Sequence, residues 1–400
     1  MTGNSSTENG SLEENYFALV PTADPGTLRP IVSSASPIPG SYNININDGG
    51  PVSAPTTLTI ANRDTTVDAN SIVFKLNGIS VPIVKTVQAN GVQVDWKFAD
   101  TPGAALISAS LAFTDSQGTN QTYSWTYSYP FLAASNSLPV GALTARGWDY
   151  RMVQTADVLG AGNSLLTAEA QLNGTIPEDQ TYITNAPNGV QLMQWNNDTA
   201  CPRDVYGLTG TCGSPAALDN IVTEALGYMH LTAGAHRFYV SSDDGIELQS
   251  GTTPSDPAAT VMGYRDGGTI NGTFDFLVEA DGLYPVRFLW YEHGGGANLE
   301  LDSVNLSDNS HVLINDPANT AGVVQVFLPD GPLTQVITTL SSATAAGPYT
   351  VEPGATVDTN LKTVTVQQSG AVRFYRLSFS SALKITQIKK VGSTIVMTYQ

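Results

Sequence analysis

The sequence predicts an all-β protein of several domains, and three observations lead to this prediction. The chain has 400 residues, which is too long for one ordinary hydrophobic core. Charged residues make up only 13%, whereas 37 Gly and 23 Pro, together with many Ser, Thr and Asn, supply turn geometries. The long Ala/Glu/Lys/Leu/Arg stretches of helical proteins are almost absent. Short strands joined by turns are therefore expected throughout.

Residues 30–130 contain about seven short segments of alternating polarity, separated by turn signals such as Asn77-Gly78. This number and spacing of strands is typical of an Ig-like β-sandwich. The run Val67–Gly78 resembles the bacterial Ig-like repeats that act as spacers in large secreted proteins. No Cys–Trp–Cys spacing is present, so the domain is not antibody-like. Residues 1–29 form a polar arm, which is either a linker or a strand donated elsewhere.

The rest of the chain divides into a linker at 131–140, a second β-sandwich at 141–318 and a small C-terminal β module at 319–400. One helix is expected at Asn163–Leu172, where a capping residue precedes apolar side chains at three- and four-residue spacing. Asn173-Gly174 ends it. The C-terminal module is rich in Thr, Val and Gly and carries several alternating segments.

The charge balance excludes one class of partner. The chain has 35 Asp and Glu against 17 Lys and Arg, a formal net charge of −18. Such a field repels phosphate backbones, and no basic stripe offsets it, so nucleic-acid binding is not expected. Acidity favours divalent cations, but it also serves solubility alone, and both explanations stay open.

The location of the protein is inferred from what the sequence lacks and from its cysteines. No stretch approaches the roughly 18 apolar residues of a membrane span, and the start has no signal-peptide pattern. The chain is thus either cytoplasmic or a mature secreted form. Cys201 and Cys212 lie in a short, turn-rich loop that suits a disulfide, with two free thiols as the alternative. The cysteines and the composition favour a secreted, extracellular protein of the cell surface.

Two segments of the sequence are the most specific. Phe238–Leu248 contains a Ser-Asp-Asp-Gly turn, and Gly282–Leu301 contains an aromatic-acidic run followed by a Gly-rich turn. Together they resemble the protective-antigen-type β-sandwich, the lectin-like fold also found in yeast flocculin adhesins. The resemblance covers residues 143–316. In carbohydrate-binding members of that family the Asp-Asp pair chelates Ca²⁺, which in turn coordinates sugar hydroxyls.

Elementary electrostatics assigns the acidic pair the same role. Two adjacent carboxylates at a strand end repel each other, and a hard cation with oxygen ligands relieves that repulsion. The resemblance implies Asp243 and Asp244 as Ca²⁺ ligands, with Asn298 adding an amide oxygen and Asp266 as a further metal candidate. Asp-Asp-Gly is also a good turn sequence without any metal, and that alternative stays open.

Four neighbouring residues are candidates for contact with a bound ligand. Glu292 adds another acidic group. Gly295 lies in a Gly run that either lets a ligand approach the backbone or forms a tight hairpin. Trp290 and Tyr291 alternate on a strand, so one is expected to face the core and the other the surface, where an aromatic ring can stack on a sugar.

Nothing in the sequence points to catalysis. The four histidines show no metal-binding spacing, and no Gly-x-Ser-x-Gly elbow or phosphate loop is present. A carboxylate pair for glycoside hydrolysis stays open because such pairs are assembled in space, although Asp243 and Asp244 are too close in sequence to flank a scissile bond. The protein is therefore expected not to be an enzyme.

Three functional hypotheses follow. The first is a secreted surface protein for binding or adhesion, with Ca²⁺ at the Ser-Asp-Asp-Gly turn and a glycan or cell-surface polysaccharide as its partner. The second is a structural subunit of an extracellular filament, sheath or surface layer, in which the N-terminal arm and terminal β segments exchange strands between copies of the chain. The third is an accessory region of a larger secreted carbohydrate-active enzyme.

Overall fold

The computed structural model describes residues 26–44, 47–48, 56–155, 162–176, 178–184, 194–196, 219–319, 322–328, 337–345, 349–358, 361–367, 373–379 and 385–399. Strands dominate this part of the chain and fall into separate sheets, so the all-β, multi-domain prediction is confirmed. Its one α-helix, α1 (Leu165–Leu172), is too short to cross a membrane, and no other helix among the described residues is long and apolar enough to do so.

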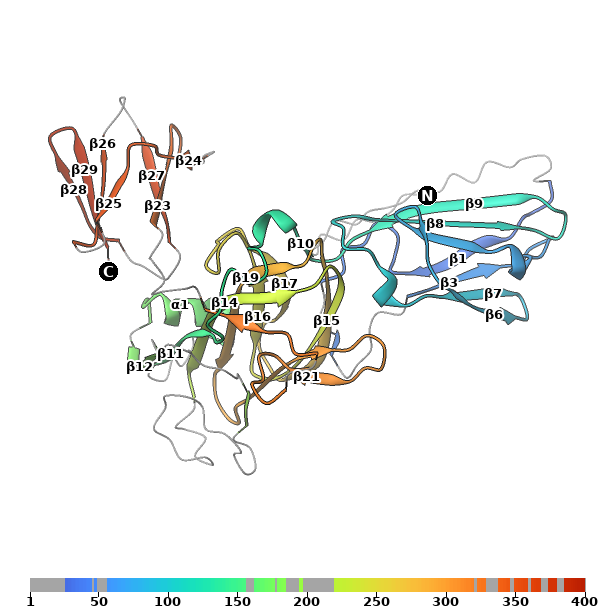
Figure 1. Ribbon diagram of the computed structural model, residues 1–400, viewed down its shortest axis with the longest axis horizontal. Coiled ribbons are helices and arrows are strands. Elements are labelled where there is room, and N and C mark those ends of the chain that lie inside the picture. The colour runs from blue at the N-terminus through green and yellow to red at the C-terminus, as the bar shows by residue number, and fades with distance from the viewer. Residues whose placement is uncertain are drawn as a thin grey trace, which may run out of the picture.

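The first sandwich consists of two four-stranded antiparallel sheets (Figure 1). One sheet has the order β1 (Ile31–Ser36), β3 (Thr57–Ala61), β7 (Gly91–Asp95), β6 (Val84–Gln88). The other has the order β5 (Ile79–Ser80), β4 (Val73–Leu76), β8 (Ile107–Thr114), β9 (Asn120–Tyr127). Short 3-10 helices lie at η1 (Ala69–Ser71) and η2 (Phe98–Asp100).

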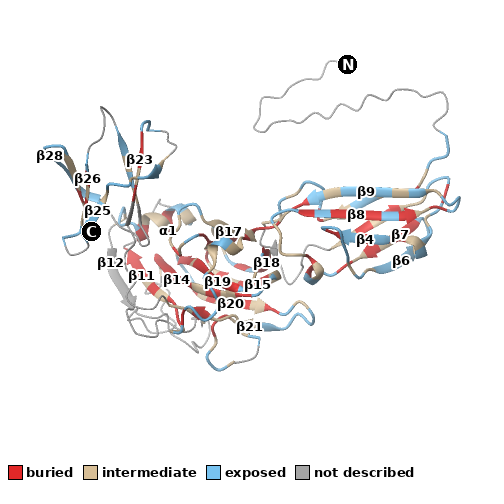
Figure 2. Ribbon diagram, turned by 45° about the horizontal axis from the view of Figure 1, so that its top comes forward, coloured by how far each residue is buried: buried red, intermediate tan, exposed pale blue. Residues whose placement is uncertain are grey.

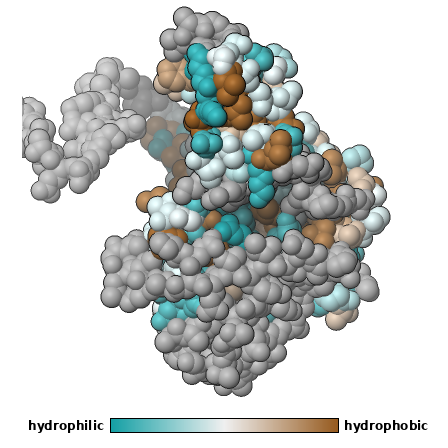
Figure 3. All heavy atoms as spheres, turned by 90° about the vertical axis from the view of Figure 1, so that its left-hand side faces the viewer, coloured by the Kyte–Doolittle hydropathy of each residue, from teal (hydrophilic) through white to brown (hydrophobic). Residues whose placement is uncertain are grey.

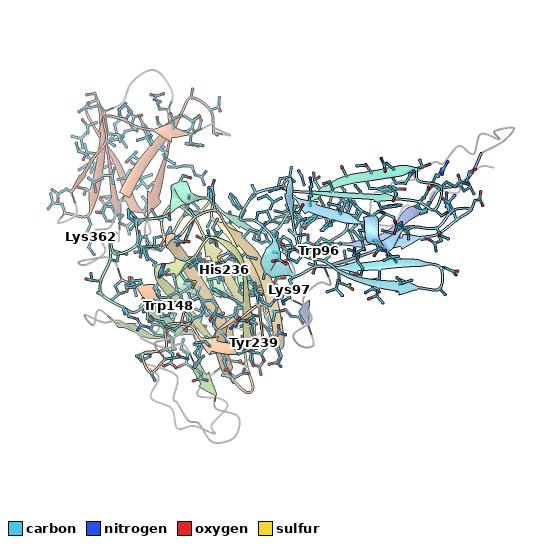
Figure 4. The ribbon with its side chains drawn as sticks, turned by 45° about the vertical axis from the view of Figure 1, so that its right-hand side comes forward. Trp96, Lys97, Trp148, His236, Tyr239 and Lys362 are labelled. Carbon is cyan, nitrogen blue, oxygen red and sulfur yellow. The ribbon has the colours of Figure 1, made fainter. Side chains whose placement is uncertain are left out.

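Alternation along β8 shows why these residues form a sandwich. Ile107, Ala109, Leu111 and Phe113 are buried, while the residues between them point to the outer face. The buried set packs with Trp96, whose position inside this sandwich is visible in Figure 4. The turn from β4 to β5 uses Asn77 at φ 47° and Gly78 at φ 81°, the pair of positive angles that a two-residue hairpin requires.

The second sandwich has two seven-stranded sheets. We call the first the junction sheet; its strands are β10 (Phe131–Leu132), β18 (Ile270–Val278), β15 (Gly234–Asp243), β20 (Asn298–Val304) and β13 (Gln194–Asn196), with β2 (Asn47–Asp48) and β21 (His311–Leu313) at its sides. We call the second the helix sheet; its strands are β12 (Glu178–Thr184), β11 (Asp149–Thr155), β14 (Ile221–Leu231), β19 (Gly282–Glu292), β16 (Ile246–Ser250) and β17 (Thr260–Arg265), with β22 (Val326–Phe327) beside β14.

The main core of the protein lies between these two sheets and is drawn red at the centre of Figure 2. Its largest fully buried side chains include Trp148, Trp290 and Phe288. On the outer face of the helix sheet, α1 covers an apolar strip that contains Val222 and Leu289. The helix begins where the hydroxyl of Ser164 accepts a hydrogen bond from the Thr167 amide at 3.2 Å, as the capping pattern predicts.

The two sandwiches share strands and apolar core at their junction. β10, the next strand after β9, pairs in parallel with β18. β2, which comes from the loop between β1 and β3 of the first sandwich, also pairs with β18. Leu277 of β18 is fully buried in the core cluster of the first sandwich. The segment expected as a linker, 131–140, begins with a strand, because Phe131 and Leu132 pair with Leu277 and Val278 of the second sandwich.

An ion pair is buried at the same junction. Arg237 of β15 donates to both carboxylate oxygens of Asp275 on β18, at 2.7 and 2.8 Å. Its guanidinium also lies 5.5 Å from the ring centre of Phe98 in η2 of the first sandwich. Burial raises the pKa of Asp275, and the contact with Arg237 opposes that rise. The planar guanidinium thus connects the junction sheet to the first sandwich.

The C-terminal module is small and also contains two sheets. One has the order β24 (Thr350–Val351), β23 (Ile337–Ser342), β27 (Phe374–Phe379), and the other has the order β25 (Thr356–Asp358), β26 (Thr363–Gln367), β29 (Thr394–Tyr399), β28 (Ile385–Val391). Its buried core consists of Val364, Val366, Met397 and Tyr399. The second sandwich lies between this module and the first sandwich (Figure 1).

Gly103 offers a test of the junction, because a Cβ at this position would collide with the backbone carbonyl of Val278 in β18. We expect Gly103→Ala to destabilise the docked pair of sandwiches by about 1–3 kcal/mol, since backbone on both sides must shift. Differential scanning calorimetry measures this as a lower melting temperature. Gly354→Ala is the matched control, because the nearest atom to its Cβ would be 3.9 Å away. Equal melting temperatures for both variants would contradict the described packing.

Candidate functional site at the sandwich rim

The chain crosses between the two sheets of the second sandwich twice at one rim. β15 of the junction sheet ends at Asp243, and β16 of the helix sheet begins at Ile246. β19 of the helix sheet ends at Glu292, and β20 of the junction sheet begins at Asn298. The two loops therefore lie together, so the segments Phe238–Leu248 and Gly282–Leu301 meet at this rim.

Backbone hydrogen bonds hold the loops against each other. The amide of Asp244 donates to the carbonyl of Tyr291 at 3.0 Å, and the amide of Tyr291 donates to the carbonyl of Gly245 at 3.1 Å. Gly245 has no room for a side chain, because a Cβ there would overlap the ring of Tyr291. The Gly of the Ser-Asp-Asp-Gly turn is thus required by packing at this position.

Three carboxylates gather where the loops meet. Asp243, Asp244 and Glu292 each offer an oxygen, and these oxygens lie within 4.8 Å of one another. Asp243 is half-buried, whereas Asp244 is 6% exposed and Glu292 is 1% exposed. The peptide bond between Asp243 and Asp244 is cis. An acidic group of this kind matches the donor set of a hard divalent cation.

The two aspartates have hydrogen-bond donors around them. Thr269 donates its hydroxyl to Asp243 Oδ1 at 2.8 Å. The backbone amide of His293 donates to Asp244 Oδ2 at 2.9 Å. Ser242 donates its hydroxyl to the backbone carbonyl of Asp244 at 3.0 Å, which fixes the turn. These neutral donors orient the carboxylates but add no positive charge.

Glu292 differs from both aspartates, because neither of its carboxylate oxygens accepts a hydrogen bond of good geometry from any described residue. Burial raises the pKa of Glu292 to about 9, and the charges of Asp244, Asp243 and Asp219 add to this rise, against a small opposing effect of the Gly294 amide. No Arg or Lys among the described residues forms an ion pair with Asp244 or Glu292. A buried carboxylate in this position must hold a proton or a cation.

The other two predicted metal ligands, Asn298 and Asp266, lie in different surroundings. Asn298 lies directly opposite Asp243 in the β15–β20 pairing, and its amide donates to the Ser241 hydroxyl at 3.0 Å. Asp266 is outside the three-carboxylate group and accepts a hydrogen bond from the Leu165 amide at 2.6 Å, at the start of α1. Asn298 thus borders the acidic group, whereas Asp266 is engaged at the helix.

The two aromatic candidates are both buried. Trp290 is 0% exposed within the main core, where its indole nitrogen donates to the Asp243 carbonyl at 3.1 Å. Tyr291 is 3% exposed under α1, and its hydroxyl accepts a hydrogen bond from the Gly267 amide at 2.6 Å. The expectation that one of them faces solvent is wrong, because the helix covers the outer face of the strand.

The glycine run forms the exposed side of the rim. Gly295 has φ 111°, and a Cβ there would meet nothing within 4 Å, so the space beside this loop is open. The amide of Gly295 donates to Asp219 Oδ1 at 3.2 Å. Both roles considered for the run are compatible with this placement, since the loop turns the chain and leaves its backbone accessible.

Sequence reasoning missed two residues that precede β14. The amide of Asn220 donates to the His293 carbonyl, which places Asp219 and Asn220 beside the second loop. Asn220 is 7% exposed, and its Oδ1 has no hydrogen-bond partner among the described residues. No local motif marks these residues, because they reach the rim only through the pairing of β14 with β19. Cys201 and Cys212 lie outside the described residues, so the disulfide stays a prediction.

No protein-family model matches the chain, and no curated protein matches it. Among solved structures it is similar to the Epithelial Adhesin 9 A domain from Candida glabrata in complex with Galb1-4GlcNAc, at 10% identity and TM-score 0.35, over 48% of this chain and 94% of that one. It is also similar to the PA14 sugar-binding domain from an RTX adhesin, at 16% identity and TM-score 0.30, over 43% and 96% of the two chains.

A third similar structure is the PA14 domain of the antifreeze protein MpAFP, at 20% identity and TM-score 0.32, over 50% of this chain and 98% of that one. These neighbours are PA14 and adhesin domains by description. At these identities and TM-scores they establish neither family membership nor an activity for this chain. The Ig-like character of the first sandwich stays a prediction.

The raised pKa of Glu292 predicts a pH dependence in metal-free buffer. The folded protein keeps the proton up to a pH of about 9, whereas the unfolded chain releases it near 4.5. Stability therefore falls as the pH rises between these values, by up to about 1.4 kcal/mol per pH unit. Calorimetric melting in a chelating buffer at pH 5, 7 and 8.5 measures this slope.

Glu292→Gln is the matched control for this measurement, because it keeps the shape of the side chain and removes the titrating proton. We expect its melting temperature to depend less steeply on pH than that of the wild type. Identical slopes for the two proteins would show that Glu292 does not titrate as the buried site requires.

Proposed function

We propose that the protein is a secreted surface protein that binds carbohydrate through its second sandwich, with Ca²⁺ held at the rim by Asp243, Asp244 and Glu292. The observation that carries the proposal is the buried Glu292, whose carboxylate lies beside two further acids and accepts no hydrogen bond of good geometry from the described residues. A solvated turn has no need for such an arrangement, whereas a cation site does.

The available donors fit a calcium ion better than a transition metal. Every candidate ligand atom in the group is a carboxylate oxygen, and Ca²⁺ prefers oxygen ligands in flexible numbers. His293 lies in the same loop, but its described contact with the group is made by its backbone amide. Soft or nitrogen-rich sets, which select zinc or copper, are not formed by these residues. When bound, Ca²⁺ supplies free coordination positions that suit vicinal hydroxyl groups.

The surroundings of the site suit a small polar ligand. Asp243 keeps part of its side chain in solvent, and on the second loop Gly294 and Gly295 are exposed, with open space around the Cβ position of Gly295. Asn298 and Thr269 place an amide and a hydroxyl next to Asp243. Amide and hydroxyl groups can both donate and accept hydrogen bonds, as sugar hydroxyls do. Because Trp290 and Tyr291 are buried, polar contacts carry the proposed recognition rather than aromatic stacking.

The competing explanation is that Glu292 stays protonated and has only a packing role, with no metal ion at the rim. Burial and the neighbouring charges favour the neutral acid when no cation is present. The two states differ in what they bind: a neutral acid needs no ion, whereas the ionised cluster binds one strongly. Calcium binding therefore distinguishes them directly.

We expect isothermal titration calorimetry of the wild-type protein to show saturable Ca²⁺ binding. Asp244→Asn removes one charge from the group and is expected to weaken the affinity at least about tenfold. Asp308→Asn is the matched control, since Asp308 is exposed, lies far along the chain in a turn, and is expected to leave the affinity unchanged. Equal titration curves for wild type and Asp244→Asn would remove the metal from the proposal.

A glycan array tests the ligand. We expect the wild-type protein to bind a subset of glycans in Ca²⁺, and this binding to disappear in EDTA and in Asp244→Asn. Asp308→Asn again serves as the control and should keep the wild-type pattern. A protein that binds Ca²⁺ in the calorimeter but no glycan on the array would leave the ion a structural role and refute carbohydrate binding.

A further inference from the structure

β28 of the C-terminal module is an unusual edge strand. It is the last strand of its sheet and pairs with β29 on one side only, among the residues that the structure describes. All seven of its residues are exposed, including Ile385, Ile388 and Val391 at 38%, 66% and 54%. The strand is drawn pale blue along its length in Figure 2. An open strand edge with exposed apolar side chains is a template for another strand.

The module that carries this edge is basic, in contrast to the rest of the chain. Residues 319–400 contain six Lys and Arg against three Asp and Glu, a net charge of +3 in a protein whose total is −18. Lys389 and Lys390 are the one adjacent basic pair in the sequence, and both lie on β28. Figure 3 shows apolar and polar surface side by side on this module, at the top of the view. The edge therefore favours an acidic, partly apolar strand.

The N-terminal arm has that composition. Residues 1–25 contain four acidic residues and no basic one. They include the run Tyr16-Phe-Ala-Leu-Val20, in which aromatic and branched side chains favour a strand. Only Asn15 separates this run from Glu13-Glu14. Pro21 follows and ends any strand at that point. The arm thus has an acidic pair followed by an apolar segment, which complements an edge that carries a basic pair and exposed apolar side chains.

We propose that the segment Glu13–Val20 of one copy of the chain adds as an antiparallel strand to the free edge of β28 in a second copy. With Glu14 opposite Lys390, Asn15 falls opposite Lys389 and Tyr16 falls opposite Ile388, and the irregularity of β28 between Ile385 and Gln387 lies beyond these pairs. Acidic and basic residues then meet at one end of the strand pair, and apolar residues meet at the other. The backbone bonds of the new strand provide affinity, and these side-chain pairs provide the register.

The geometry of the chain requires a second copy. The arm is anchored at the end of the first sandwich that is remote from the junction, where Arg29 forms an ion pair with Asp115 at 2.6 Å and Leu28 pairs with Asp64. The chain from Val20 to Leu28 spans at most about 28 Å, which is roughly the length of the eight-residue strand β8. The second sandwich still separates that point from the C-terminal module (Figure 1).

Sedimentation velocity of the full chain over a range of concentrations tests the proposal. We expect the wild type to form species larger than the monomer, and Phe17→Pro to remain monomeric because proline removes a strand donor and fixes the backbone. Ser6→Pro, outside the proposed strand, is the matched control and should associate like the wild type. A wild type that is monomeric at every concentration overturns the proposal, as does association that Phe17→Pro leaves unchanged.

Charge reversal checks the register independently of folding. We expect Lys389→Glu with Lys390→Glu to weaken association at least about tenfold, since like charges then face each other. Adding Glu13→Lys and Glu14→Lys in the same chain should restore it, because each interface then again joins opposite charges. Association that the first pair leaves intact, or that the four changes together fail to restore, contradicts the pairing of these segments.

Discussion

The rim depends on one backbone constraint, the pair of hydrogen bonds that joins the Asp244–Gly245 turn to Tyr291 at the end of β19. These bonds hold two sheet-crossing loops in register, so the residue after Tyr291 is forced into the space behind Asp244. That residue is Glu292. Tyr291 packs beneath α1 and Gly245 packs against its ring, and these contacts hold both loops at this point. Acidic side chains are therefore brought together by the fold of their backbone, against their mutual repulsion.

Several other carboxylates of the second sandwich have an arginine partner, which the two buried acids of the rim lack in the described part of the chain. Arg287 forms ion pairs with the half-exposed Glu169 of α1 at 2.5 Å and with the buried Glu224 of β14 at 2.6 Å, and so places one positive charge between them. Asp275 is likewise matched by Arg237 at the junction. In these two places the second sandwich provides an arginine beside a buried carboxylate. At the rim, Asp244 and Glu292 have no arginine or lysine partner among the described residues, and the proposed cation site rests on this difference.

The sequence alone predicts what depends on near neighbours in the chain. The alternation of β8, the capped helix α1 and the Asp243-Asp244 pair are all local patterns, and the structure contains them. It predicts less well what depends on sheet crossings and pairing between distant segments. The burial of Tyr291 under α1 arises in this way. Asp219 and Asn220 could not be predicted for the same reason, because they lie more than seventy residues from the loop to which they hydrogen-bond.

The shared junction has a mechanical consequence. Tension applied to the first sandwich enters the second through β10, which lies parallel to β18 and continues directly from β9. Such a load shears the short strand pair and must also extract Leu277 from the neighbouring core before the two bodies can separate. Under stretching we expect the pair to behave as one stiff element, with the acidic rim held in a constant direction relative to the first sandwich.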